Sequence, residues 1–155
     1  MATIKLTPDF KEFLQLLNSQ KIEYMLIGGY AVALYGFVRP TKDLDVWIAA
    51  SPASQGKLAD VLVKFGFSPE AVRQPLFTEQ KRILRMGVPP NRLEILVQIA
   101  GVEFSDCHSR CRTMEIDGVP VPVISYADLI ANKRAANRAS DRVDVERLEA
   151  RRSQP

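Results

Sequence analysis

The spacing of apolar residues in the first third of the chain predicts helices and strands in alternation. Residues 8–19 carry apolar side chains at helical spacing, and Pro8 or Asp9 stands near the start: Phe10, Phe13, Leu14 and Leu17. The dense apolar segment 22–27 predicts a buried strand that Gly28 and Gly29 end. A short helix over 30–36 and a second strand over 43–50 are expected to follow.

The remainder of the chain predicts one more helix, several strands and two C-terminal helices. Ser51 and Pro52 begin a helix that Gly66 ends. Strands are expected over 77–87 and 92–99, and Asp117-Gly118 predicts a hairpin turn within 113–125. Ser125 is expected to cap a helix over 125–138, with Asp128 at a capping-box position, and a last helix covers about 140–151.

This order of elements predicts a mixed β-sheet with flanking helices, in the α/β (α+β) class. The chain has 155 residues, the usual size of one domain. We therefore expect a single domain over 1–155, in which residues 125–155 form a helical C-terminal appendage.

Composition and charge narrow the range of function classes. Hydrophobic residues make up 46% of the chain, but no apolar run approaches the roughly 20 residues that span a bilayer. Asp9, Lys11 and Glu12 interrupt any signal-peptide core, so a cytoplasmic protein without membrane partners is expected. Cys107, His108 and Cys111 are too few for a zinc tetrahedron and are expected to be ordinary helix residues.

The C-terminal segment 132–155 is rich in arginine but leaves two readings open. Its basic residues could bind a polyanion. Acidic residues are interspersed among them, however, which is typical of a solvated helix face with ion pairs between successive turns.

Three carboxylates stand where a buried strand would normally be apolar. Asp43 and Asp45 are two residues apart and therefore share one face of the predicted strand. Glu94 lies in the middle of another apolar strand. If the two strands are neighbours, the three acids converge, and such an arrangement is costly without a cation. Mg²⁺, which prefers oxygen ligands, is the expected ion, and two such ions could assist a phosphoryl displacement.

The two glycines upstream predict a phosphate-binding turn. Gly28 and Gly29 end a strand and begin a helix, and glycine lets a phosphate approach the backbone closely. Tyr30 could stack on a base, and Arg39 lies near the turn and could bind a phosphate or the acceptor. Together with the acids, this turn predicts a site for a nucleoside triphosphate with Mg²⁺.

These residues resemble the signature of the polymerase-β-like nucleotidyltransferase superfamily. The sequence has Ile27-Gly28-Gly29, then thirteen residues, then Asp43-Leu44-Asp45-Val46. Glu94 resembles the third carboxylate of that superfamily, which a later strand carries. The resemblance implies the nucleotidyltransferase fold, with Asp43, Asp45 and Glu94 as catalytic and metal-binding residues for two Mg²⁺ ions.

A closer resemblance, over about residues 22–148, is to the minimal prokaryotic nucleotidyltransferases, including the AbiEii-type toxins of toxin–antitoxin systems. It implies that Lys133 contacts the triphosphate. It also implies that Asp141 and Asp144 have a structural or acceptor-activating role. A cognate antitoxin or other partner protein is a further implication.

The resemblance implies transfer of a nucleoside monophosphate from an NTP to a hydroxyl group of an RNA, a protein or a small molecule. Gly29 and Glu94 stand where many members of the superfamily have Ser and Asp. These differences leave open a catalytically inactive protein that binds a nucleotide or a partner. A structural cation held by the acids alone is a third reading.

Overall fold

The computed structural model describes residues 4–41, 43–73 and 75–153, which form six helices and six strands. The helices are α1 (Pro8–Ser19), α2 (Gly28–Leu34), α3 (Pro52–Phe65), α4 (Phe104–Arg110), α5 (Tyr126–Ala136) and α6 (Ala139–Arg152). The strands are β1 (Tyr24–Ile27), β2 (Asp43–Ile48), β3 (Ile83–Met86), β4 (Arg92–Leu96), β5 (Arg112–Ile116) and β6 (Val119–Val123).

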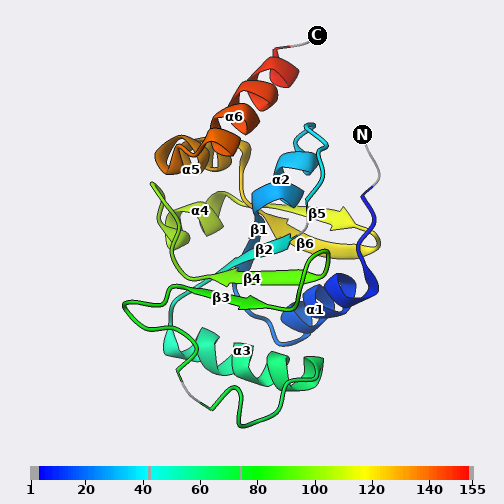
Figure 1. Cartoon of the computed structure of the whole chain (residues 1–155), viewed down its shortest axis with the longest axis vertical. Coiled ribbons are helices and arrows are strands. Elements are labelled where there is room, and N and C mark those ends of the chain that lie inside the picture. The colour runs from blue at the N-terminus through cyan, green and yellow to red at the C-terminus, as the bar shows by residue number, and fades with distance from the viewer. Residues whose placement is uncertain (1–3, 42, 74, 154–155) are drawn as a thin grey trace.

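One mixed sheet of order β3-β4-β2-β1-β6-β5 organises the molecule. β1 pairs with β2 antiparallel and with β6 parallel, and β2 pairs with β4 parallel. Helices α1 and α3 lie on one side of the sheet, and α2, α4 and the α5–α6 pair lie on the other (Figure 1). The predicted fold class, a mixed sheet with flanking helices, is confirmed.

The core forms where the apolar helix faces meet the sheet. The apolar face expected for α1 is fully buried: Phe10, Phe13, Leu14 and Leu17. Leu58, Val61 and Leu62 of α3 are buried in the same way. Thr7 and Ser51 cap the two helices, since their hydroxyl groups accept backbone N–H groups three residues on. Helical spacing therefore identified both packing faces correctly.

Two expected strands are shorter than the sequence indicated. In the segment 77–87 only β3, over residues 83–86, is a strand. Residues 78–81 form a turn, because Thr78 and Lys81 exchange backbone hydrogen bonds and the Thr78 hydroxyl accepts the Lys81 N–H. The expected strand 92–99 ends at Leu96. Burial of Leu76, Phe77 and Val97 explains why these non-strand residues are apolar.

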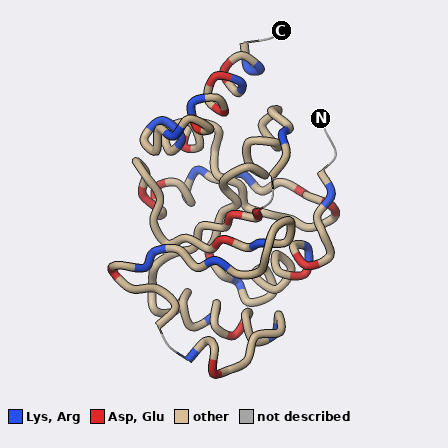
Figure 2. Tube along the Cα trace, in the orientation of Figure 1, with Lys and Arg blue, Asp and Glu red and all other residues tan. Residues whose placement is uncertain are grey.

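The turn and cap signals near the C-terminus place the last elements. Asp117 and Gly118 both have positive φ, at 50° and 83°, as a two-residue hairpin turn requires. Ser125 caps α5 by accepting the N–H of Asp128, whose carboxylate pairs with Arg110 of α4. Figure 2 shows acidic and basic residues mixed along α6 and side by side on the central strands. Among the described residues, no helix is long and apolar enough to cross a membrane.

Candidate active site

The pairing of β2 with β4 brings the three predicted carboxylates together. In this parallel pair Asp45 lies opposite Glu94, and Asp43 lies opposite Arg92. Asp43 and Asp45 point to the same side of the sheet because they are two residues apart. One carboxylate oxygen from each of Asp43, Asp45 and Glu94 lies within 4.8 Å of the other two. The neighbouring strands that the sequence argument needed are therefore present.

The three carboxylates differ in their partners. Arg92 donates two hydrogen bonds to Asp43, of 3.0 and 2.9 Å, and Arg85 donates one of 2.9 Å to Glu94. Oδ1 of Asp45 is buried without a hydrogen-bond partner among the described residues. Burial raises the pKa of Asp45 to about 8. The negative charge of Glu94, its hydrogen bond with Asp45 and the negative charge of Asp43 act in the same direction. Asp45 is therefore the acid that most needs a cation.

The glycine pair makes room for the site. Gly28 has a φ of +69°, and a Cβ atom there would overlap the Asp45 carboxylate. A Cβ on Gly29 would lie 2.5 Å from the hydroxyl oxygen of Thr41. Neighbouring side chains within the site therefore leave no room for a Cβ atom at either position. This reason for glycine is separate from any need for a phosphate to approach the backbone closely.

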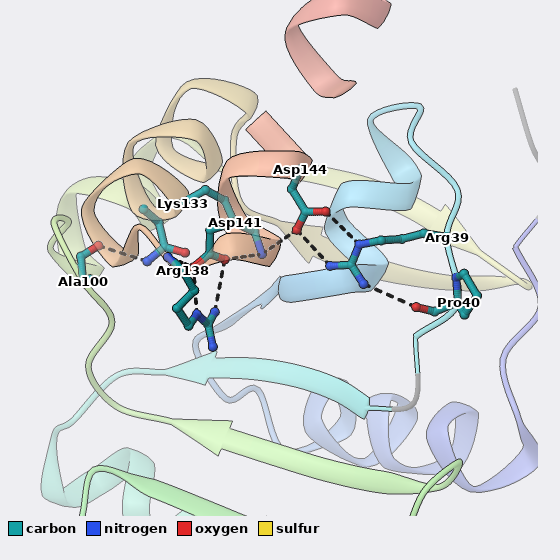
Figure 3. A network of polar contacts seen from close by, with 8 residues as sticks. Arg39, Pro40, Ala100, Lys133, Arg138, Asp141 and Asp144 are labelled. Carbon is teal, nitrogen blue, oxygen red and sulfur yellow. Dashed lines mark hydrogen bonds and ion pairs between the residues drawn. The ribbon is translucent and has the colours of Figure 1, made fainter. Parts of the chain in front are cut away.

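Three cations, those of Arg39, Lys133 and Arg138, line the same cavity as the carboxylates, and two buried aspartates pair with them (Figure 3). Arg39 makes two hydrogen bonds to Asp144, of 2.8 and 2.9 Å. Nζ of Lys133 lies 3.2 Å from Asp141 and 3.1 Å from Asp144. Arg138 donates to Asp141 at 2.7 Å. The network joins the segment after α2 to α5 and α6.

The two aspartates act from behind these cations. Asp141 and Asp144 are 0% and 1% exposed, and neither lines the cavity. Burial alone would raise their pKa values, but hydrogen bonds from Arg138 to Asp141, and from Arg39 and Lys133 to Asp144, lower both below the ordinary value. These buried ion pairs support a structural role for Asp141 and Asp144 rather than acceptor activation. The solvated-face interpretation is wrong for Lys133, which is 6% exposed.

One cavity of about 570 Å³ collects most of the predicted site residues. Its lining includes Gly28, Gly29, Arg39, Asp43, Asp45, Glu94 and Lys133. Tyr30 is a correction: its side chain is buried against Phe10, with ring centroids 6.0 Å apart, and does not line the cavity. The first residue after Gly28-Gly29 faces the core because α2 begins at Gly28 and turns it inward.

Sequence reasoning missed two arginines of the cavity and one beside it. Arg85 and Arg138 line the cavity, and Arg92 holds Asp43 at its edge. In the sequence they are three arginines among many. Arg92 could have been predicted, because it is two residues before Glu94 in β4 and therefore lies on the same face of the strand.

The cysteine and histidine residues of the segment 107–111 lie in α4 or directly after it. Cys107 is buried, His108 stacks on Phe104, and Cys111 lies just after the helix end. Within the described chain, the acidic triad is the group of such side chains close enough to share a metal ion. Cys107 and His108 are helix residues as expected, whereas Cys111 follows the last helical residue.

A mixed sheet with this strand order and acidic face is the nucleotidyltransferase fold, as structural comparison shows. The antibiotic-resistance factor ANT(2'')-Ia matches with a TM-score of 0.61 and 14% identity, over 94% of this chain and 83% of that one. The same enzyme in complex with adenylyl-2''-tobramycin matches with a TM-score of 0.60 and 15% identity, over 94% and 87%.

The lincosamide antibiotic adenylyltransferase LnuA, with lincomycin bound, matches with a TM-score of 0.61 and 15% identity, over 95% of this chain and 99% of that one. At such identities the likeness concerns the fold. No curated protein matches the sequence. The model of the family described as nucleotidyltransferase of unknown function (DUF6036) matches residues 5–152, and the chain belongs to this family.

The residues present fit the divalent metal that this class of enzyme implies. Asp43, Asp45 and Glu94 supply three hard oxygen ligands within reach of one ion, and the unpartnered Oδ1 of Asp45 is an open ligand position. Since Arg92 and Arg85 hold the other two acids, a metal would compete with them for Asp43 and Glu94.

Replacement of Asp45 by Asn should stabilise the metal-free fold, increasingly so at higher pH. Because the folded-state pKa is raised from 3.8 to about 8, folding takes up a proton between these values, and stability falls as pH rises through this range. Asn has no charge to neutralise. Urea unfolding of both proteins in chelator at pH 5 and pH 8 should give a larger gain for Asp45→Asn at pH 8. An equal loss of stability at both pH values would contradict the proposed cost.

Removal of Asp144 should destabilise the fold far more than removal of an exposed ion-pair partner on the same helix. Asp144→Ala leaves Lys133 buried with one partner fewer, and breaking a buried pair costs about 3–5 kcal/mol. Glu149→Ala removes the exposed pair with Arg134 and should cost about 1 kcal/mol or less. Urea unfolding at pH 7 measures both, and similar losses would show that the network is not a structural support.

Proposed function

We propose that the protein transfers a nucleoside monophosphate from an NTP to a hydroxyl group of an acceptor, with Mg²⁺. One observation carries the proposal: a carboxylate triad with an unpartnered oxygen on Asp45 shares a cavity with the cations of Arg39, Lys133 and Arg138. Opposite charges placed in this way suit a triphosphate that is bound by metal on one side and by side chains on the other.

The cations would orient the triphosphate. Arg39 and Arg138 line the cavity while their aspartate partners fix the side chains, and Lys133 adds a third positive charge. Gly28 and Gly29 line the same cavity beside them. Such preorganised charge lowers the barrier because it need not be rearranged during the reaction.

The acids would hold the metal and manage the acceptor. Asp43, Asp45 and Glu94 are the proposed ligands for two Mg²⁺ ions, which when bound supply charge neutralisation at the phosphates. The acceptor oxygen attacks the α-phosphorus, the bond to the β-phosphate oxygen breaks, and pyrophosphate leaves. Glu94, at the outer side of the triad next to β3, accepts the proton of the acceptor hydroxyl.

The neighbours favour an adenylyl donor and a small-molecule acceptor. LnuA is an adenylyltransferase of lincosamide antibiotics, and ANT(2'')-Ia is known with an adenylylated tobramycin. We therefore place ATP first among the donors to be tested and small hydroxyl compounds first among the acceptors. An RNA or protein acceptor, a cognate antitoxin and a cytoplasmic location stay predictions of the sequence resemblance.

A nucleotide-binding protein without turnover is the second candidate. The observation in its favour is that arginines occupy two of the three acids, with Arg92 held by Asp43 through two hydrogen bonds. If metal does not displace these arginines, the chain would bind a nucleotide through Arg39, Lys133 and Arg138 but would not release pyrophosphate.

Thermal melting with each of the four NTPs, with and without Mg²⁺, tests the donor site. Ligand at about 100 times its dissociation constant adds about 2.7 kcal/mol, which for a chain of this size raises Tm by roughly 5–10 °C. The rise should require Mg²⁺, should depend on the base, and should vanish in the double variant Asp43→Ala with Asp45→Ala.

Asp60→Ala is the matched control, because Asp60 is an exposed acid on α3, on the opposite side of the sheet. It should respond to Mg²⁺ and NTP as the parent does. Transfer of α-phosphate label from NTP, with release of pyrophosphate, then separates the two candidates. A Tm rise that survives in the double variant would refute the metal site, and binding without pyrophosphate release across RNA, protein and small-molecule acceptors would favour the non-catalytic protein.

A further inference from the structure

A second cavity, of about 510 Å³, adjoins the candidate active site. Trp47, Arg82, Val97, Val102 and Phe104 are among its lining residues. Residues 98–100 line both cavities, so the two meet at this segment after β4. Trp47 is on the same face of β2 as Asp43 and Asp45, four and two residues beyond them, which places the second cavity along the same side of the sheet.

Two residues that line this cavity each carry a hydrogen-bond donor without an acceptor. The indole Nε1 of Trp47, a residue that is 1% exposed, and the Nε of Arg82 are buried without a partner among the residues that the structure describes. The third such atom is Oδ1 of Asp45, at the proposed metal site. A buried polar atom without a partner is costly, so two such donors on residues of one cavity indicate a group that supplies acceptors.

The chemistry of the lining restricts that group. An indole N–H and a guanidinium can only donate hydrogen bonds, and the guanidinium is always charged. Arg82 makes no ion pair with any other described residue, whereas Arg85, three residues further on in β3, pairs with Glu94. Glu103 also lines the cavity, but it is exposed and solvent screens its charge. Val97, Val102 and the ring of Phe104 add apolar surface.

We propose that this second cavity is a binding site for an oxyanion carried on an apolar body, with Trp47 and Arg82 as the residues that recognise the oxyanion. The site is separate from the NTP site and uses none of its residues for recognition. Carboxylates and phosphate esters share this chemistry, and the charge of Arg82 distinguishes both from neutral ligands of the same shape.

The single tryptophan of the chain provides a direct test, because its indole N–H gives the only side-chain resonance of its kind in a ¹H–¹⁵N spectrum. Phenyl phosphate, benzoate and neutral phenol are titrated into the metal-free protein. We expect the Trp47 Nε1–H resonance to shift with saturation for the two anions and not for phenol. The anion with the lower dissociation constant identifies phosphate or carboxylate as the preferred group.

Arg82→Gln should weaken anion binding at least about tenfold, since a charge-assisted hydrogen bond is lost. The unchanged remainder of the spectrum would show that the variant is folded. Arg138→Gln, which removes a cation from the first cavity, is the matched control and should leave the Trp47 response intact.

The proposal is overturned if the anions leave the indole resonance unmoved, as they would if water alone fills the cavity. It is equally overturned if Arg82→Gln binds like the parent or if Arg138→Gln abolishes the response. None of these outcomes depends on nucleotidyl transfer.

Discussion

The parallel pairing of β2 with β4 is the constraint on which the rest of the site depends. It sets Asp45 opposite Glu94 and thereby concentrates negative charge on one face of the sheet. Isolated buried carboxylates are costly, and three within reach of one another are more so. This cost is seen in the raised pKa of Asp45 and in its carboxylate oxygen that lacks a hydrogen-bond partner among the described residues. The fold tolerates the arrangement because thirty-five buried hydrophobic residues of the described chain form the core, and because cations lie near the acids.

The counter-charges fall into two groups with different jobs. Arg92 and Arg85 come from β4 and β3 and pair with the acids directly. Arg39, from the segment after α2, and Lys133 and Arg138, from the C-terminal helices, are paired with Asp141 and Asp144 instead. Because Asp141 and Asp144 are buried behind the cations, they fix the second group in place. These cations therefore do not pair with the carboxylates of the triad. This separation keeps negative and positive surfaces apart within one cavity, as a metal-bound polyphosphate requires.

The same balance explains the small residues of the site. Gly28 is glycine because the carboxylate of Asp45 occupies the space that a side chain would need, and Gly29 because Thr41 does so. The glycines thus follow from the acids rather than from the turn alone. At the adjoining cavity the unsatisfied groups are donors instead of acceptors, since Trp47 and Arg82 each have a buried donor that lacks an acceptor. Both cavities therefore show polar groups that packing alone does not satisfy.

Local patterns in the sequence determined much of this protein. Apolar spacing placed α1 and α3 and their buried faces, and Asp117-Gly118 placed the β5–β6 hairpin, because helical and strand periodicity and turn chemistry act over a few residues. The two-residue spacing of Asp43 and Asp45 put them on one face for the same reason. Glu94 joined them in the prediction only on the assumption that its strand was a neighbour.

The tertiary structure decided what depends on distant segments. Which strand lies beside β2, which arginine meets which acid, and whether Lys133 is solvated or buried are all set by packing between residues up to about a hundred positions apart, such as Arg39 and Asp144. Tyr30 could not be assigned from the sequence because an aromatic side chain suits a core and a base-binding site equally well. Its contact with Phe10, on the first helix of the chain, decided for the core.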